Sequence, residues 1–119
     1  MKILLIVNTS PWASTRGQCA LRFAGAAVRA GLTLAAVYFR DDGVYTALPS
    51  AATDAGSLDL CEAWQALGED SGIDLMLCSA ALARRLPEGA LTGMGSRFRP
   101  AGLVELVTVM QACDRVVTF

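Results

Sequence analysis

Histidine is absent from this 119-residue sequence, and so is any pair of cysteines spaced as Cys-x-x-Cys. A zinc site built from such ligands is therefore not predicted. The lack of histidine also excludes the thiol–imidazole pair with which cysteine proteases and acyltransferases activate their nucleophile and protonate the leaving group. Any reactive cysteine here has to act as a thiolate alone, which suits sulfur exchange better than acyl transfer.

Charged residues are scarce: they make up 18% of the chain, and the formal net charge is −1. This composition does not indicate a phosphate-binding surface, so direct binding of nucleic acid is not expected. Long apolar runs are missing as well. Residues 20–39 are interrupted by Arg22, Arg29 and Gly31, and the run at residues 3–7 is shorter than a signal peptide requires. We therefore expect no membrane span, and a cytoplasmic protein with reduced thiols.

Apolar residues are abundant, at 54% of the chain. The length fits one domain, residues 1–119, which can bury a sizeable core without disulfides. A small interior does not easily hide so much apolar surface. The composition therefore predicts a sheet that is buried on both faces and, in addition, a surface that is covered in an oligomer.

Apolar runs alternate with helical periods along the chain, which is typical of an α/β domain with a parallel sheet. Strands are predicted at residues 2–7, 32–39, 73–77 and 114–119, with room for a fifth. The first helix has capping-box spacing from Thr15 to Gln18 and a stop at Gly31, and the second spans about residues 58–70. A short helix follows Cys78. Residues 103–110 form a helix that is apolar almost all round, so we expect it to be buried on more than one side.

Three segments between these elements are predicted to be irregular: residues 8–14, 43–56 and 93–100. The second is long for so small a domain, which favours a functional or interfacial role over an idle surface loop. Because reactive groups gather beyond the carboxyl ends of parallel strands, residues 8–14 and 40–56 are expected at the same edge as Cys78. Residues 10–15 precede a helix and resemble a phosphate cradle, although they lack a glycine-rich core.

Cys78 is the candidate catalytic residue. It closes an apolar strand and opens a helix, and the free N–H groups of a first helical turn stabilise a thiolate. The alternative is that Cys78 is a small buried hydrophobe. Packing better explains Cys61 and Cys113, whereas Cys19 is a candidate for a second exposed thiol. Arg84 and Arg85 either complement the helix dipole or bind a partner or an anionic sulfur donor.

Four segments, taken in order, resemble the TusD/DsrE sulfurtransferase subunits of the DsrE/F-like family. These segments are residues 37–45, the helix around Trp64, residues 77–85 with Cys-Ser-Ala-Ala-x-x-Arg-Arg spacing, and the ending Cys-Asp-Arg-Val-Val-Thr-Phe at residues 113–119. The resemblance implies a single-domain, three-layer DsrE/F-like α/β fold with a parallel sheet of four to five strands flanked by helices. It also implies that Cys78 carries a persulfide.

The same resemblance implies assembly with TusC/DsrF-like and TusB/DsrH-like subunits in a heterohexamer. An upstream persulfide donor protein would supply the sulfur, and a TusE/DsrC-like protein would accept it, in tRNA thiolation or in sulfur oxidation. This chemistry needs no metal or organic cofactor. Two other functions stay open from the residues: a non-catalytic structural subunit whose thiol is incidental, and a small flavin- or nucleotide-binding module.

Overall fold

The computed structural model describes residues 1–49 and 59–119, and its centre is a five-stranded parallel sheet. The strands lie in the order β4-β3-β2-β1-β5. Their bounds are β1 Lys2–Val7, β2 Thr33–Phe39, β3 Asp74–Cys78, β4 Phe98–Ala101 and β5 Arg115–Thr118. The expected four strands are therefore present, and β4 is the fifth.

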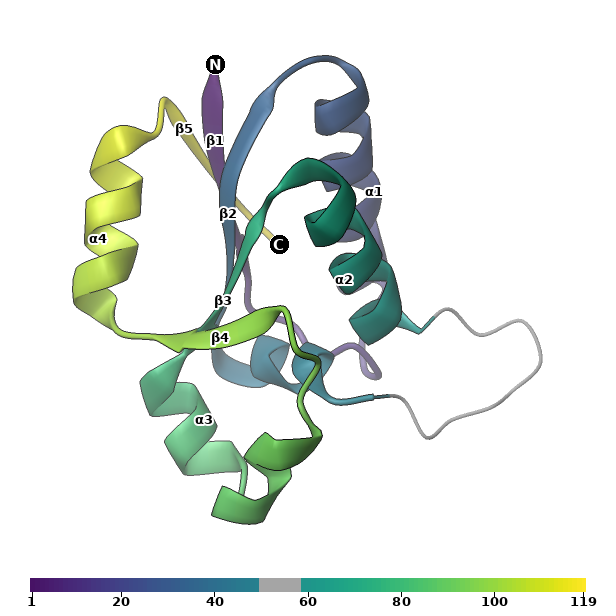
Figure 1. Ribbon diagram of the computed structural model, residues 1–119, viewed down its shortest axis with the longest axis vertical. Coiled ribbons are helices and arrows are strands. Elements are labelled where there is room, and N and C mark those ends of the chain that lie inside the picture. Colours follow the sequence, from purple (N-terminus) through teal and green to yellow (C-terminus); the bar gives the residue numbers. More distant parts are fainter. Residues whose placement is uncertain (50–58) are drawn as a thin grey trace.

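Helices cover both faces of the sheet, which gives the three layers that the sequence predicted (Figure 1). Helices α1 (Arg16–Arg29) and α2 (Leu60–Ser71) lie on one face, and α4 (Leu103–Ala112) lies on the other. The short helix α3 (Ser79–Arg85) packs beyond the carboxyl ends of β3 and β4, against the 3₁₀ helix η1 (Asp41–Ala47). A second 3₁₀ helix, η2, spans Glu88–Gly93.

The central strands are buried on both faces, as their continuous apolar sequences predicted. Leu4, Leu5, Val37, Leu75 and Leu77 are fully buried. Phe39 packs edge-on against Trp64 of α2, with 5.6 Å between ring centroids. Sandwiching these side chains between two helical layers removes them from water, which is the main favourable contribution to folding.

Two glycines end helices where the sequence predicted stops. Gly31 follows α1 with φ +82°, and Gly72 follows α2 with φ +68°. Both angles lie in the left-handed region that glycine adopts without a steric penalty. At the other end of α2, the Asp59 carboxylate accepts a hydrogen bond from the Glu62 N–H, so the helix begins at Leu60 rather than at residue 58, which lies outside the described residues.

The predicted capping box at Thr15 is wrong. Thr15 has helical backbone angles, and within the described part of the chain its side chain makes no capping hydrogen bond. The Ser14 hydroxyl accepts a hydrogen bond from the Arg16 N–H instead, at 3.1 Å. A residue with helical angles points its side chain away from the free N–H groups, so the preceding serine takes over the role.

Two segments that were predicted to be irregular have regular structure. Residues 41–47 form η1, and the rest of the predicted 43–56 segment, from residue 50, lies outside the described residues. Residues 98–101 form β4, which pairs with β3. This strand contains Pro100, and a proline argues against a strand in a sequence-based prediction. An edge strand such as β4 tolerates it, because one side of the strand is not hydrogen-bonded to another strand.

The predicted burial of α4 on more than one side is also wrong. Among the described residues, α4 buries Leu106, whereas Val104 is 81% exposed and Leu103 and Val107 are also exposed. The helix rests on the sheet through a single stripe, because no further layer formed by residues 1–49 or 59–119 lies outside it (Figure 1). Within residues 1–49 and 59–119, no helix has the length and apolar character needed to cross a membrane.

Candidate functional site

Cys78 lies where the sequence predicted, at the junction of β3 and α3. It is the last residue of β3 and also the N-cap residue of α3, with φ −58° and ψ 115°. In the sheet it pairs with Ala101 of β4. Its side chain is 8% exposed, so the thiol is largely removed from solvent while standing at the carboxyl edge of the sheet.

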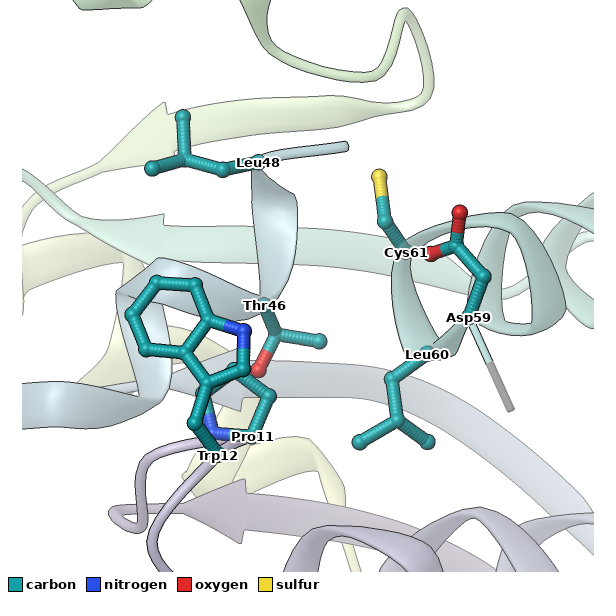
Figure 2. Close-up of a pocket in the computed structure, with 7 residues that line it drawn as sticks. All are labelled: Pro11, Trp12, Thr46, Leu48, Asp59, Leu60 and Cys61. Carbon is teal, nitrogen blue, oxygen red and sulfur yellow. The ribbon is translucent and has the colours of Figure 1, made fainter. Parts of the chain in front are cut away.

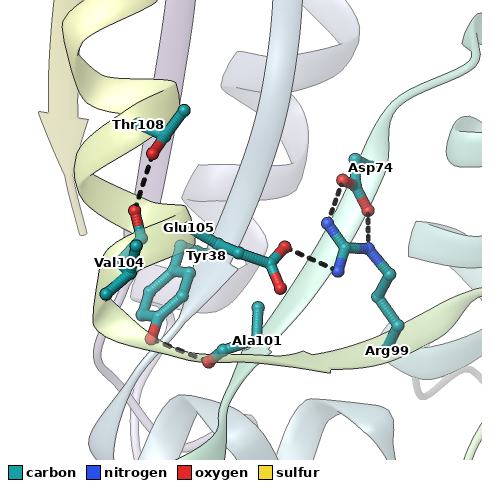
Figure 3. A network of polar contacts seen from close by, with 7 residues as sticks. All are labelled: Tyr38, Asp74, Arg99, Ala101, Val104, Glu105 and Thr108. Atoms are coloured by element: carbon teal, nitrogen blue, oxygen red, sulfur yellow. Dashed lines mark hydrogen bonds and ion pairs between the residues drawn. The ribbon is translucent and has the colours of Figure 1, made fainter.

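Tyr38 of β2 shares the sheet face of Cys78. Tyr38 lies opposite Met76 in the parallel register, and alternation along β3 puts Met76 and Cys78 on the same face. The tyrosine ring is fully buried beneath the α4 layer, and its hydroxyl donates a hydrogen bond to the Ala101 carbonyl at 3.2 Å (Figure 3). Since Ala101 is the register partner of Cys78, the phenol ends beside the cysteine.

The environment of Tyr38 keeps its hydroxyl protonated. Burial raises the pKa of Tyr38 well above its ordinary value, and the neighbouring Cys78 side chain raises it further. The phenol is therefore a hydrogen-bond donor at neutral pH. Sequence analysis assigned Tyr38 no role, and the available signal was a tyrosine within a strand that is buried on both faces, since a buried phenol needs a hydrogen-bond partner.

A cluster of ion pairs holds β3, β4 and α4 together next to this site (Figure 3). Arg99 of β4 contacts the Asp74 carboxylate through two nitrogens, at 2.9 and 2.7 Å, and the Glu105 carboxylate at 2.8 Å. All three side chains are substantially exposed, so the pairs contribute little to stability. The bidentate pair with Asp74 orients the Arg99 guanidinium between β4 and β3, and the single contact with Glu105 ties α4 to β4 beside Ala101.

The described loops at the carboxyl edge come together as predicted. The Arg40 N–H donates to the Val7 carbonyl at 2.9 Å, and Trp12 stacks near Tyr45 with 5.4 Å between ring centroids. Within the described part of the chain, these loops and the start of α2 enclose a cavity of about 30 Å³, lined by Pro11, Trp12, Thr46, Leu48, Asp59, Leu60 and Cys61 (Figure 2). That volume holds roughly one water molecule, so this particular cavity does not accommodate a flavin or nucleotide.

In the predicted phosphate cradle at residues 10–15, two backbone N–H groups are bonded to nearby hydroxyls. The Ser10 hydroxyl accepts a hydrogen bond from the Trp12 N–H at 3.1 Å, and the Ser14 hydroxyl accepts one from the Arg16 N–H. These bonds shape the turn into α1. They occupy N–H groups that a bound phosphate would otherwise accept from, so this segment gives no support to the flavin- or nucleotide-binding module.

Comparison with known proteins places this geometry in a family. The sequence model of the DsrE/DsrF-like family matches residues 1–119, the whole chain. This chain belongs to the DsrE/DsrF-like family. A protein named Sulfurtransferase TusD from Salmonella newport is 35% identical over 130 residues, with both chains covered completely. A Sulfurtransferase TusD homolog from Vibrio parahaemolyticus is 38% identical over 126 residues, covering 97% of this chain and 95% of its own length.

A solved structure agrees with this DsrE/DsrF-like fold. The ychN protein from E. coli superposes with a TM-score of 0.80, covering 100% of this chain and 99% of its own. At 20% sequence identity the likeness concerns the fold alone. The predicted α/β architecture with helices on both faces of a parallel sheet is thereby confirmed.

The other three cysteines of this DsrE/DsrF-like chain differ in burial. Cys61 is buried in α2, and its thiol donates to the Ala47 carbonyl at 3.4 Å, which confirms the packing prediction. Burial, followed by the nearby Asp59 carboxylate, raises the pKa of the Cys61 thiol. Cys113 is partly buried against the core, and burial raises the pKa of its thiol too. Cys19 on α1 is exposed, as the sequence allowed, whereas Cys78 is buried.

The two arginines after Cys78 have different surroundings. Arg85 donates from Nε to the Asp42 carboxylate at 2.9 Å, which ties the end of α3 to η1. Arg84 is exposed. Arg85 thus has a role that the sequence did not predict, a contact between two elements of the carboxyl edge. Arg84 remains a candidate for binding a partner or an anionic sulfur donor.

Proposed function

We propose that this chain is a sulfurtransferase subunit that accepts sulfane sulfur as a persulfide on Cys78 and passes it to a thiol of a partner protein. The observation that carries the proposal is the placement of Cys78 at the carboxyl edge, at the start of a helix and beside a protonated tyrosine, in a chain without histidine. The full-length relatives named Sulfurtransferase TusD support the transferase role.

The reaction consists of two thiol exchanges. The Cys78 thiolate attacks the outer sulfur of a donor persulfide; a new S–S bond forms, the donor's S–S bond breaks, and the donor leaves as a thiolate. The acceptor thiolate then attacks the outer sulfur on Cys78 and releases the Cys78 thiolate. Neither step changes the overall oxidation state, so no external oxidant or reductant is consumed.

The position of Cys78 suits both steps. Its place at the carboxyl edge of the sheet faces the side where a partner would dock, and its low exposure limits access by oxidants and small thiols in solution. Because the chain has the candidate cysteine Cys78 and no histidine base, it fits a carrier whose sulfur is an anion both before and after loading.

The partners in this proposal are those of a cytoplasmic sulfur relay. TusC/DsrF-like and TusB/DsrH-like subunits would complete a heterohexamer, an upstream persulfide protein would load Cys78, and a TusE/DsrC-like thiol would unload it. The exposed apolar residues of α4 support assembly with further subunits, since an apolar patch of this kind is usually covered. Co-purification of this chain with both subunit types after co-expression would test the complex.

The alternative is a structural subunit in which Cys78 only fills space, and the low exposure of Cys78 favours it. Mass spectrometry separates the two functions. After incubation with a persulfide donor protein, the Cys78 peptide of the wild type should gain about 32 Da per sulfur, in the sense of persulfidation. Cys78→Ser should fold and gain nothing there, and the control Cys19→Ser should still load Cys78.

Discharge completes the test. The added mass should disappear when a TusE/DsrC-like thiol protein is added, because a carrier has to release its sulfur as well as accept it. Sulfur that accumulates mainly on Cys19, or that stays on Cys78 in the presence of every acceptor, would contradict the relay. Loss of soluble protein for Cys78→Ser would favour the structural subunit.

A further inference from the structure

The Tyr38 hydroxyl lies near two possible hydrogen-bond acceptors, the Ala101 carbonyl and the Cys78 sulfur. Its hydroxyl is held at the level of Ala101, to whose carbonyl it donates at 3.2 Å. The ring has no exposed surface, so packing fixes the position of the hydroxyl. A phenol has one proton to donate, and that proton goes to whichever nearby acceptor is stronger.

The second acceptor is the Cys78 sulfur. Ala101 and Cys78 are register partners, Tyr38 lies on the same sheet face, and the nearby Cys78 side chain contributes to the raised pKa of Tyr38. In the thiol form of Cys78, the neutral carbonyl of Ala101 receives the proton. In the thiolate or persulfide form, a negatively charged sulfur competes for it, and hydrogen bonds to an ionised acceptor are about twice as strong as neutral ones.

From this geometry we infer that Tyr38 is a positioning residue of the sulfur carrier, whose hydroxyl turns from the Ala101 carbonyl to the Cys78 sulfur anion and stabilises it. The inference rests on the proposed function for its biological meaning. In a chain without histidine, Tyr38 provides a buried hydrogen-bond donor that lowers the energy of the sulfur anion. The phenol donates a hydrogen bond but keeps its proton, because it stays neutral.

Other charges surround the pair and have to be constant for a pH measurement to report on it. Among the described residues they are Arg40 after β2, Asp74 on β3, Arg99 on β4, Glu105 on α4, and the Asp42–Arg85 pair between η1 and α3. Carboxylates and guanidinium groups keep their charge between about pH 6 and about pH 10. A change of reactivity in that range therefore reports on Cys78 and its hydrogen bonds.

The experiment compares the wild type with Tyr38→Phe, which keeps the ring and removes the hydroxyl. The rate at which iodoacetamide alkylates Cys78 is followed by peptide mass spectrometry between about pH 6 and about pH 10. We expect the midpoint of the rate profile to move up by about one pH unit in Tyr38→Phe, a roughly tenfold lower rate below the midpoint. The matched control is Tyr45→Phe, which removes the other hydroxyl of this kind in the chain and should leave the profile unchanged.

A second measurement covers the case in which Tyr38→Phe fails to fold. In the Tyr45→Phe background, Tyr38 is the chain's sole tyrosine, so 3-fluorotyrosine can be introduced there alone. The hydroxyl of 3-fluorotyrosine is a stronger hydrogen-bond donor than that of tyrosine, so the midpoint of the Cys78 alkylation profile should move to lower pH. An unchanged midpoint in a folded Tyr38→Phe, or in the fluorinated protein, overturns the inference.

The outcome also separates this inference from the proposed function. If Cys78 acquires and releases sulfur but the midpoint of the alkylation profile is the same in Tyr38→Phe, the proposed carrier function is supported and the role of Tyr38 is wrong. If the midpoint changes in Tyr38→Phe but Cys78 never takes up sulfur, the hydrogen bond is supported and the relay is wrong.

Discussion

Cys78 and Tyr38 belong to strands that are far apart in sequence, and the pairing of β2 with β3 brings them together. Each residue alone has an ordinary explanation: a small buried thiol and a core aromatic. Their combination is chemically different, because the sulfur anion of the proposed carrier would meet a neutral donor away from water. At this scale, burial alone does not distinguish the thiols, because Cys78 and Cys61 are both buried; Cys78 differs in standing at the start of a helix.

The first prediction concerns these thiols. In the folded protein near neutral pH, iodoacetamide should alkylate Cys78 faster than Cys61 or Cys113, because burial raises the pKa of both latter thiols and leaves them little thiolate. Peptide mass spectrometry of a time course gives the individual rates. Cys19→Ser removes the exposed thiol as a competing target, and unfolding in urea provides the control in which the remaining rates should converge. Equal rates in the folded state would contradict the assignment of Cys78.

At the scale of elements, the carboxyl edge is built by close approach of η1 to β1. The Arg40 N–H bonds to the Val7 carbonyl, and Gly43 then passes so close that a Cβ there would collide with the Val7 oxygen. η1 in turn packs against β3 and α3, on either side of the Cys78 junction. The position of the cysteine therefore depends on a contact that glycine alone permits.

The second prediction follows from this contact. Gly43→Ala should lower the free energy of unfolding by about 2 kcal/mol, because backbone atoms cannot move aside as the end of a flexible side chain can. Urea unfolding followed by circular dichroism measures the change. Gly89→Ala is the matched control: no described atom lies within 4 Å of a Cβ at Gly89, and its free energy should change by less than about 0.5 kcal/mol. Equal stability of the two variants would mean that η1 does not press on β1.

At the scale of the whole molecule, the chain has more apolar surface than its own fold covers. Two layers of helix bury the strands, but α4 turns Leu103, Val104 and Val107 outward, and Val116 of the edge strand β5 is exposed as well. The sequence predicted both a buried sheet and a surface for an oligomer. The structure confirms the first, and the second stays a prediction that the proposed heterohexamer would fulfil.

The third prediction tests how α4 lies on the molecule. In the isolated chain, Leu106→Ala should cost about 3 kcal/mol, because it opens a cavity under the helix. Val104→Ala should change the free energy of unfolding by less than about 0.5 kcal/mol, since Val104 is exposed and alanine is the better helix former. Thermal and urea unfolding of both variants at two protein concentrations measures this. A cost for Val104→Ala that grows with concentration would show that another copy of the chain covers this face.

Sequence patterns alone predicted most of the fold, for local physical reasons. Continuous apolar runs specify strands that are buried on both faces, as in β1 and β3, and the glycines after α1 and α2 end those helices through their backbone freedom. The same patterns predicted Cys78 at a strand–helix junction. Where the signal was weak the prediction was wrong: β4 is short and contains Pro100, and η1 has no clear period.

Tertiary structure decided the rest, because contacts between distant segments depend on register and on the layer that each helix occupies. The apolar composition of α4 could not show that just one stripe of it meets the sheet, since hydrophobicity specifies that a side chain avoids water but not what covers it. Nor could alternation along β2 place Tyr38 beside Cys78, since that meeting requires both the β2–β3 register and the β3–β4 register. The placement of the proposed reactive thiol at a strand–helix junction is thus determined by the sequence, and the tyrosine beside it by the way the strands align.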